Sequence, residues 1–431
     1  MKNGLLISLL LTHLLIFSCK KDKDETPPVI TISNPHDNQQ YTALDTVWVL
    51  TAIADETSLQ QIEITLTDIN KIPVLSTVVI TPETNSITLT IPYVLDDINL
   101  ASGSYYIWIR ASDGTNIHDK FRSISINEVP KELKYVYLFT FGNSTTVHAL
   151  RKSPTGNPQQ LFDINGDFTG SAISSKFQKF FTCGKITGNL NAYNIVDNEE
   201  SWSVPVISNP PFTYFENVSC YNDIIYVSFY DGYIKGYNNN GTITITANSP
   251  AGSYPTVIAA GDNYLYADHA MISGSSRIFG EYYITTGILK QQITTNYEIV
   301  KIFEKDNDNV FLFANQNGQG ILRLYNITDN GTWEPHTMPA GQIHDALQID
   351  GNAYLIALDD GIYKYQYANN SLTAYLPGVY AITLKYDVLN SEVYINTGTQ
   401  INVYDYSTHT LINTIPSADP ILDFQFLYNK Q

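Results

Sequence analysis

The chain of 431 residues has little cysteine, methionine and basic charge. It holds three cysteines, none spaced as CxxC, and its eight histidines form no HExxH or other close pair, so no zinc-binding pattern is present. It also lacks a GxSxG nucleophile elbow and a P-loop. Against 42 acidic residues stand 24 basic ones, a formal net charge of −18. This charge would repel a phosphate backbone, so we expect no nucleic acid partner.

Long hydrophobic runs are also scarce, and the main one lies at the N-terminus. Lys2 precedes an apolar run over residues 5–17 that is too short to span a membrane stably. Residues 16–19 resemble the lipobox of bacterial lipoproteins, in which the cysteine is lipidated and becomes the new N-terminus. The charged segment 20–26 has too little apolar content to form a core. We expect a signal peptide at 1–18 and a flexible tether at 19–26, lipidated at Cys19; a plain secretory signal is the alternative.

The acidic tether after Cys19 resembles the signal that sends lipoproteins of Bacteroidetes-type bacteria to the outer face of the outer membrane. The resemblance implies an outer-membrane protein that contacts the membrane through its lipid and faces the cell exterior. A flexible spacer in the periplasm is the alternative for this short segment.

Residues 27–129 have the pattern of a β-sandwich. About seven short alternating strands follow Pro27-Pro28 within roughly 100 residues. The segment resembles bacterial Ig-like modules that open with a proline pair and close with an Asp-Gly turn and a final strand, which implies a stalk. Because no cysteine pair bridges it, its core must come from apolar side chains, and we expect these to include Trp48, Ile64, Leu66, Tyr106 and Trp108.

The rest of the chain, residues 130–431, repeats a unit best seen at 216–247. That unit reads as four short strands with tight turns at Asp231-Gly232 and Asn240-Gly241, where glycine tolerates positive φ. The third strand of a unit ends in tyrosine followed by asparagine or aspartate. This pair recurs at multiples of roughly 40–45 residues, the period of a four-stranded propeller blade, at Tyr193, Tyr237, Tyr325 and Tyr404.

Seven second strands can be identified along this part of the chain. An orphan strand, Ile421–Tyr428, follows the last unit, whereas the first unit lacks an initial strand. An open ring would leave a long unpaired edge. We therefore expect an all-β protein: an Ig-like sandwich followed by a seven-bladed β-propeller that the C-terminal strand closes. The second strands lie at 135–141, 179–183, 224–229, 264–266, 310–314, 353–358 and 392–396.

One stretch of the repeat, residues 192–202, resembles the docking repeat of quinoprotein-like propellers, with degenerate copies at 282–293 and 404–415. The scaffold also resembles YVTN-type surface-layer propellers, several of which are ligand-capture lipoproteins beside outer-membrane transporters. The resemblance implies a transporter or a glycan as partner. Because no tryptophan recurs with the repeat, we expect no quinone and no other cofactor. Cys183 and Cys220 fall in different units, so we expect two buried thiols, with a disulfide as the alternative.

A large or polar side chain precedes each expected innermost strand. In a closed propeller these positions converge on one mouth of the central channel. A ring of aromatics there could stack on a sugar, a flat macrocycle or a partner's side chains. The alternative is that these side chains wedge between the blades. The candidate ligand-binding residues are Phe168, Tyr214, Tyr254, Tyr297, His344, Tyr380 and Asp419.

Three functions remain open on this pattern. The first is a non-enzymatic surface protein that binds a nutrient, glycan or protein partner at the propeller mouth. The second is a glycoside hydrolase or lyase, which would need two facing carboxylates, such as Glu216 with Asp345 or Asp419. The third is an adhesion or assembly scaffold. We assign no catalytic residue and no metal ligand.

Overall fold

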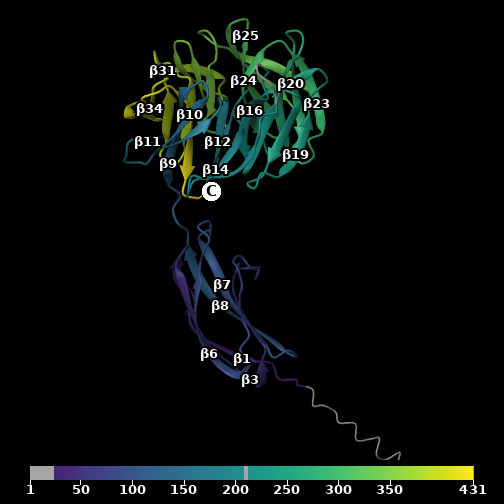
Figure 1. Cartoon of the computed structure of the whole chain (residues 1–431), viewed down its shortest axis with the longest axis vertical. Coiled ribbons are helices and arrows are strands. Elements are labelled where there is room, and N and C mark those ends of the chain that lie inside the picture. Colours follow the sequence, from purple (N-terminus) through teal and green to yellow (C-terminus); the bar gives the residue numbers. More distant parts are fainter. Residues whose placement is uncertain (1–23, 208–211, 431) are drawn as a thin grey trace, which may run out of the picture. The chain divides into compact units, whose positions relative to one another are not determined.

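The computed structural model describes residues 24–207 and 212–430, and every regular element in them is a β-strand. The chain divides into two compact units, Met1–Pro130 and Lys131–Gln431 (Figure 1). Within the described ranges we find no helix with the length and apolar character to cross a membrane. The signal peptide, Cys19 and the tether up to residue 23 lie outside these ranges.

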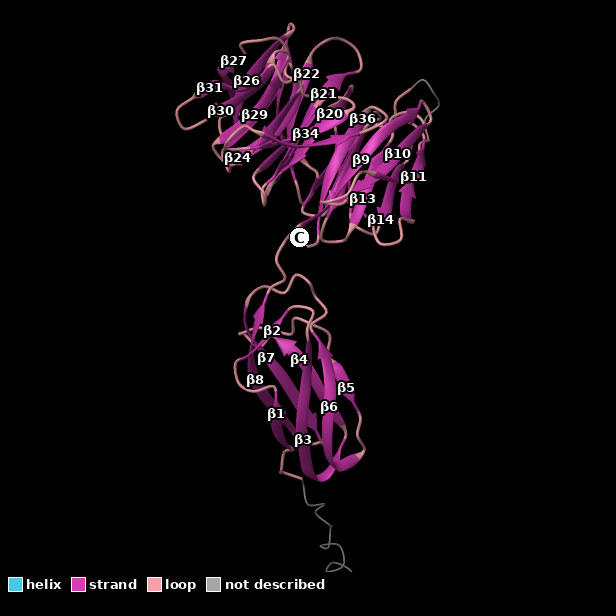
Figure 2. Ribbon diagram, turned by 90° about the vertical axis from the view of Figure 1, so that its left-hand side faces the viewer, coloured by secondary structure: helices cyan, strands magenta, loops and turns pink. Residues whose placement is uncertain are grey.

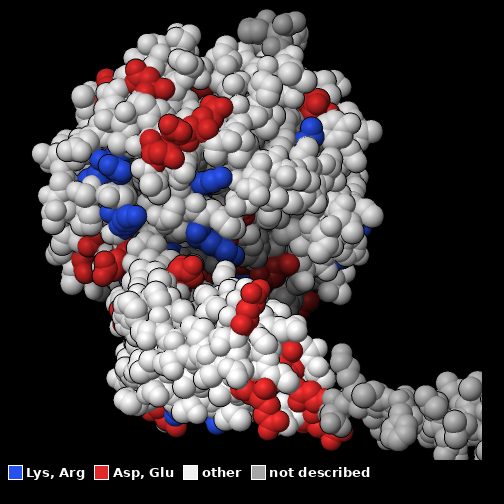
Figure 3. Space-filling view, turned by 60° about the horizontal axis from the view of Figure 1, so that its bottom comes forward, with Lys and Arg blue, Asp and Glu red and all other residues white. Residues whose placement is uncertain are grey.

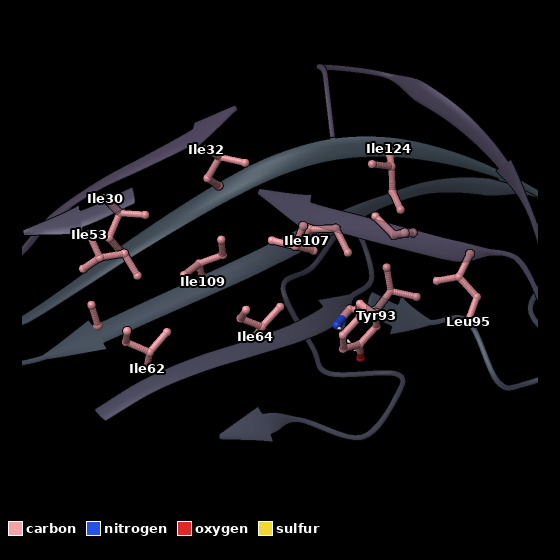
Figure 4. Close-up of a cluster of buried hydrophobic side chains, with 14 of the residues drawn as sticks. Ile30, Ile32, Ile53, Ile62, Ile64, Tyr93, Leu95, Ile107, Ile109 and Ile124 are labelled. Carbon is pink, nitrogen blue, oxygen red and sulfur yellow. Dashed lines mark hydrogen bonds between the residues drawn. The ribbon is translucent and has the colours of Figure 1, made fainter. Parts of the chain in front are cut away.

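The N-terminal unit consists of two sheets that share one hydrophobic core. The first sheet has the order β1-β3-β6 and the second the order β2-β8-β7-β4-β5, in which β2 runs parallel to β8. Isoleucines from both sheets point into the space between them (Figure 4). The strands are β1 (Val29–Asn34), β2 (Gln39–Thr42), β3 (Thr46–Leu59), β4 (Gln61–Thr67), β5 (Val78–Ile80), β6 (Thr84–Val94), β7 (Gly103–Ser112) and β8 (Ile117–Asn127).

The prediction of the core residues of this unit is partly wrong. Ile64 and Leu66 are buried as expected, but Trp48 is 55% exposed. Successive side chains of a strand point to opposite faces, and Val47 and Val49 occupy the inner face of β3. Trp108 likewise lies outside the core, where its ring stacks on that of Phe121 at 6.0 Å. Tyr106, on the same face of β7, is also only half-buried. Ile107 and Ile109, which alternate with these aromatics, fill the core instead.

The described residues of the C-terminal unit form seven four-stranded antiparallel sheets, which we number along the chain (Figure 2). Sheet 1 contains β36 (Ile421–Tyr428), β9 (Leu133–Asn143), β10 (Thr146–Lys152) and β11 (Gln159–Asn165); sheet 2 β12 (Gly170–Ser174), β13 (Lys179–Cys183), β14 (Leu190–Asn194) and β15 (Glu200–Val204); sheet 3 β16 (Phe215–Tyr221), β17 (Ile224–Phe229), β18 (Tyr233–Tyr237) and β19 (Ile243–Asn248).

The remaining four sheets follow the same pattern, with strand order equal to chain order. Sheet 4 contains β20 (Ser253–Ala260), β21 (Tyr264–Met271), β22 (Arg277–Tyr283) and β23 (Leu289–Thr295); sheet 5 β24 (Glu298–Asp306), β25 (Asn309–Gln316), β26 (Gln319–Asn326) and β27 (Gly331–Thr337); sheet 6 β28 (Asp345–Gln348), β29 (Ala353–Leu358), β30 (Gly361–Gln366) and β31 (Ser371–Pro377); sheet 7 β32 (Thr383–Asp387), β33 (Glu392–Asn396), β34 (Gln400–Asp405) and β35 (Leu411–Pro416).

The C-terminal strand completes sheet 1. β36 pairs antiparallel with β9, with Ile421 opposite Thr140 and Tyr428 opposite Leu133. Both ribbon views show β36 beside β9 (Figures 1 and 2). The pairing confirms the prediction that the orphan strand supplies the missing innermost strand, and it leaves β9 without a free edge.

The repeated tyrosine packs between neighbouring sheets. It stands near the end of the third strand and points toward the preceding sheet, so that Tyr237 of sheet 3 stacks on Trp202 of sheet 2 at 5.9 Å. Large aromatic rings bury much apolar area at little cost in rotamer entropy. Six of the seven sheets carry this residue, as Tyr193, Tyr237, Tyr282, Tyr325, Tyr365 and Tyr404.

Both cysteines of the C-terminal unit are free thiols, which confirms the expectation of unpaired cysteines. Cys183 is fully buried and Cys220 is half-buried. Burial raises the pKa of both thiols, that of Cys220 to about 12. Neither side chain is therefore a reactive thiolate at neutral pH.

Candidate functional site

The structure does not gather the seven side chains predicted for the mouth into one ring. Tyr297 is 5% exposed and lies in the core between sheets 4 and 5. The ring of Tyr214 contacts those of Phe215 and Phe229 at 4.7 and 5.4 Å. The same kind of packing holds two more of the set: Phe168 stacks on Phe139 at 5.8 Å and Tyr254 contacts Tyr230 at 4.6 Å. The contacts of Phe168, Tyr254 and Tyr297 join neighbouring sheets, as in the alternative in which the side chains wedge between the sheets, whereas those of Tyr214 stay within sheet 3.

Two of the predicted residues do come together. The His344 ring lies 5.3 Å from the ring of Tyr380, which is 48% exposed. His344 Nε2 is 2.6 Å from Asp359 Oδ1, a contact that lowers the pKa of that carboxyl. Asp419 stands in the turn before β36, where its backbone carbonyl accepts a hydrogen bond from the Ser417 hydroxyl.

A cavity of about 600 Å³ runs between the innermost strands of the C-terminal unit. Strands β12, β16, β24, β28, β32 and β36 contribute to its wall, so residues from six of the seven sheets meet there. Of the seven predicted residues His344 lines it. The cavity, which we call the channel, has a polar wall that includes Ser171, Asn217, Ser219, Lys301, Asp345, Thr383, Lys385, Asp423 and Gln425.

Two ion pairs face the channel and form one cluster. Lys301 Nζ lies 3.2 Å from Asp345 Oδ1, and Lys385 Nζ lies 3.2 Å from Asp423 Oδ1. The lysine side chains keep 44% and 22% of their surface accessible, whereas Asp345 is only 4% exposed. Each ammonium also feels the other pair's carboxylate. We call these four residues the channel cluster.

The two lysines of the channel cluster differ in their electrostatics. The Asp345 carboxylate, more than any other group, raises the pKa of Lys301. For Lys385 the loss of hydration outweighs the attraction of Asp423, and nearby Lys301 adds repulsion, so its pKa is lowered. A ligand oxygen that accepts from Lys385 would restore part of the lost solvation.

Charged side chains of both signs are visible on one face of the protein (Figure 3). On the face drawn in Figure 3, acidic and basic side chains lie in separate small groups. The channel cluster itself balances two positive against two negative charges. It can therefore offer both hydrogen-bond donors and acceptors to one ligand.

The aspartates of the channel cluster also join neighbouring sheets. Asp345 of sheet 6 accepts a hydrogen bond from the backbone amide of Leu384 in sheet 7 at 2.8 Å. Asp423 of sheet 1 accepts from the amide and hydroxyl of Ser171 in sheet 2 at 3.2 and 2.6 Å. These contacts hold the carboxylates in place between the sheets.

The carboxylates named for the enzymatic alternative are engaged separately. Glu216 accepts a hydrogen bond from Thr213 at 2.6 Å and lies 3.5 Å from Lys185 Nζ. Asp345 belongs to the channel cluster, and Asp419 shares no polar contact with either of them among the interactions of the described side chains.

A group of three carboxylates in the N-terminal unit has the composition of a cation site. Oxygens of Asp24, Asp55 and Asp113 lie within 4.8 Å of one another. Such hard oxygen ligands suit Ca²⁺. Asp113 Oδ1 already accepts hydrogen bonds from the amides of Thr115 and Asn116 at 2.6 Å each, which braces the turn before β8.

Sequence reasoning missed Lys301, Lys385 and Asp423. The available signal was a charged residue next to apolar ones in an innermost strand: Asp423 is the one charge in β36, whereas the strands of Lys301 and Lys385 carry other charges as well. Reading that signal requires knowing which face of the strand points to the channel.

No known protein family and no curated protein matches the sequence of this chain. Among solved structures it is similar to a protein from Lactobacillus plantarum, at 15% identity and a TM-score of 0.52, over 69% of this chain and 100% of that one. It is also similar to the computationally designed Ika8 protein (14% identity, TM-score 0.47, 68% of this chain and 90% of that one) and to BamB from Moraxella catarrhalis (12%, 0.42, 67% and 90%).

The first of these likenesses and the sheet topology define the class of the fold. The chain is an all-β protein with a β-propeller-like arrangement of four-stranded sheets. Propeller-like folds are not specific to enzymes, so this likeness does not decide between binding and catalysis.

Proposed function

We propose that this chain is a non-enzymatic binding protein that holds a polar ligand in the channel of a seven-bladed propeller. The observation that supports it is the channel cluster, in which two lysines and two aspartates face a cavity of about 600 Å³. This volume falls in the range typical of small-molecule sites, roughly 300–1,000 Å³.

The lining favours a hydroxyl-rich ligand such as a glycan. Lys301, Lys385 and Gln425 donate hydrogen bonds, and the carboxylates accept them. Sugar hydroxyls both donate and accept, so they can use both kinds of group. The His344 and Tyr380 rings, in mutual contact at the edge of this wall, offer a surface on which a sugar ring can stack.

The N-terminal unit and the leader complete the proposal. The two-sheet unit 27–129 is an Ig-like stalk, and lipidation of Cys19 anchors the protein at the cell surface. An outer-membrane transporter would then receive the captured ligand. The support for this part is the lipobox-like sequence 16–19 and the charged segment after it.

The test is binding of a panel of oligosaccharides by isothermal titration calorimetry. Two charge-neutral variants remove one ion pair each without leaving an unpaired buried charge: Lys301→Met with Asp345→Asn, and Lys385→Met with Asp423→Asn. For the oligosaccharide that binds the wild type, each variant should have an affinity that is lower by about tenfold or more, because hydrogen bonds to charged groups contribute about 1.5–3 kcal/mol.

Lys176→Met is the matched control, because Lys176 is an exposed lysine outside the channel. The control should bind like the wild type, and recovered oligosaccharide should be chemically unchanged. Wild-type affinity in both channel variants would place the ligand elsewhere. Cleaved oligosaccharide would overturn the non-enzymatic assignment.

A further inference from the structure

The first sheet departs from the repeat at the position of the packing tyrosine. Lys152 pairs with Val136 on the neighbouring strand, as Tyr193 pairs with Phe180 in sheet 2 and Tyr404 with Val393 in sheet 7. Lys152 also lies about one repeat, roughly 40 residues, before Tyr193. In this register, six sheets place a tyrosine where sheet 1 places a lysine.

The space that this tyrosine would fill is open. A cavity of about 620 Å³ lies between sheets 7 and 1, and we call it the seam cavity. Its apolar wall comes from both sheets, with Val136 of sheet 1 facing Val403 and Ile415 of sheet 7. The other lining residues that matter here are Tyr135, Lys152, Glu392, Tyr394, Ile412 and Asn413.

Other sheet pairs show what a filled position looks like. Tyr237 stacks against Trp202 on the outer strand of sheet 2, and the hydroxyl of Tyr325 accepts a hydrogen bond from Gln291 on the outer strand of sheet 4 at 2.8 Å. In the register of the third and fourth strands, Asn413 stands in sheet 7 where Trp202 stands in sheet 2. The seam therefore lacks the tyrosine of the repeat, and Asn413 supplies no aromatic ring in its place.

Polar groups stand at the edge of the seam cavity. Lys152 is 8% exposed, and its ammonium donates to the carbonyls of Ser153 and Pro154 at 2.9 and 3.1 Å. Loss of hydration lowers its pKa. The Tyr394 hydroxyl donates to Glu392 Oε2 at 3.1 Å, and burial raises the pKa of Glu392.

We propose that the seam cavity is a second binding site, for a small aromatic molecule that carries an acidic group. The ring of the ligand lies between Val136 and Val403, where the repeat would place a tyrosine. The acidic group accepts a hydrogen bond from Lys152, whose two carbonyl contacts leave its third N–H for the ligand. The site is separate from the channel, so it does not depend on the proposed glycan binding.

The test uses two fluorescent probes that differ in one group. Anilinonaphthalene sulfonate carries an acidic group, and phenylnaphthylamine is the same ring system without it. Titration of the folded full chain should give saturable binding of both, about tenfold tighter for the sulfonate, because a hydrogen bond between charged groups adds about 1.5 kcal/mol or more.

Three variants separate the contributions. Lys152→Met keeps the cavity and removes the charge, so binding of the sulfonate should weaken to the level of phenylnaphthylamine. Lys152→Tyr restores the repeat residue and fills the cavity, so both probes should lose binding while the melting temperature is kept or raised. The surface control Lys176→Met should leave both affinities unchanged.

Either of two results overturns the proposal. One is the absence of saturable binding to the wild type. The other is a Lys152→Met variant with an undiminished preference for the sulfonate. If Lys152→Tyr proves unstable, the comparison of the two probes on Lys152→Met decides the outcome alone.

Discussion

Removal of one aromatic ring from the closing strand should cost much of the stability of the C-terminal unit. Phe424 on β36 is fully buried, and its ring lies 5.8 Å from that of Phe426 and 6.4 Å from that of Tyr394 in sheet 7. Replacement of a buried phenylalanine with alanine typically destabilises by about 3–5 kcal/mol, through lost transfer energy and the cavity left behind. Phe424→Ala should therefore lower the free energy of unfolding by about this amount.

Urea unfolding followed by tryptophan and tyrosine fluorescence measures this loss. The matched control is Phe141→Ala, because Phe141 lies on β9 in the same sheet but is exposed. The control should change the free energy of unfolding by less than about 1 kcal/mol. A similar, small loss for both variants would refute the reasoning, because the Phe424 ring on β36 would then not be packed against sheet 7.

Three further predictions concern single side chains. His269 is buried between the Tyr282 hydroxyl and the Ile278 carbonyl, and burial lowers its pKa from 6.5 to about 4. As the pH falls below 6.5, the histidine is protonated in the unfolded chain but not in the folded protein, so the free energy of unfolding should decrease. Urea unfolding at pH 7 and pH 5 should show that this decrease is about 2 kcal/mol smaller in His269→Gln than in the wild type. The thiol of Cys183 should react with a disulfide reagent at pH 8 only after the protein is unfolded, and reaction of this thiol in the folded protein would contradict its burial. Labelling with a radioactive fatty acid should mark the wild type and not Cys19→Ala; labelling of both would remove the proposed anchor.

The repeat was readable from the sequence because turns and tyrosines mark it. Asp231-Gly232 and the Tyr-Asn pairs define the ends of strands, and strands β13 and β17 begin and end at the predicted residues. The closing strand followed from counting, since one strand was missing at the start and one was left over at the end. Local chemistry and strand number therefore predict most of this architecture.

The candidate site was harder to predict because it depends on the face of each strand. Tyr297 and Tyr214 stand at the expected places in the chain, yet the ring of Tyr297 turns between the sheets and that of Tyr214 packs within its own sheet. Trp48 failed for the same reason, since a shift of one residue reverses the face of a strand. Lys301 and Lys385 line the channel because strands from six sheets surround it, and the local sequence around each lysine does not show which strands these are.

The most direct test of the central claim is the position of a bound ligand. A crystal structure of the protein soaked with the oligosaccharide that binds in solution would locate it. We predict density in the channel, with ligand oxygens about 2.7–3.2 Å from the ammonium groups of Lys301 and Lys385. Density on the outer strands of the sheets, with an empty channel, would contradict the account.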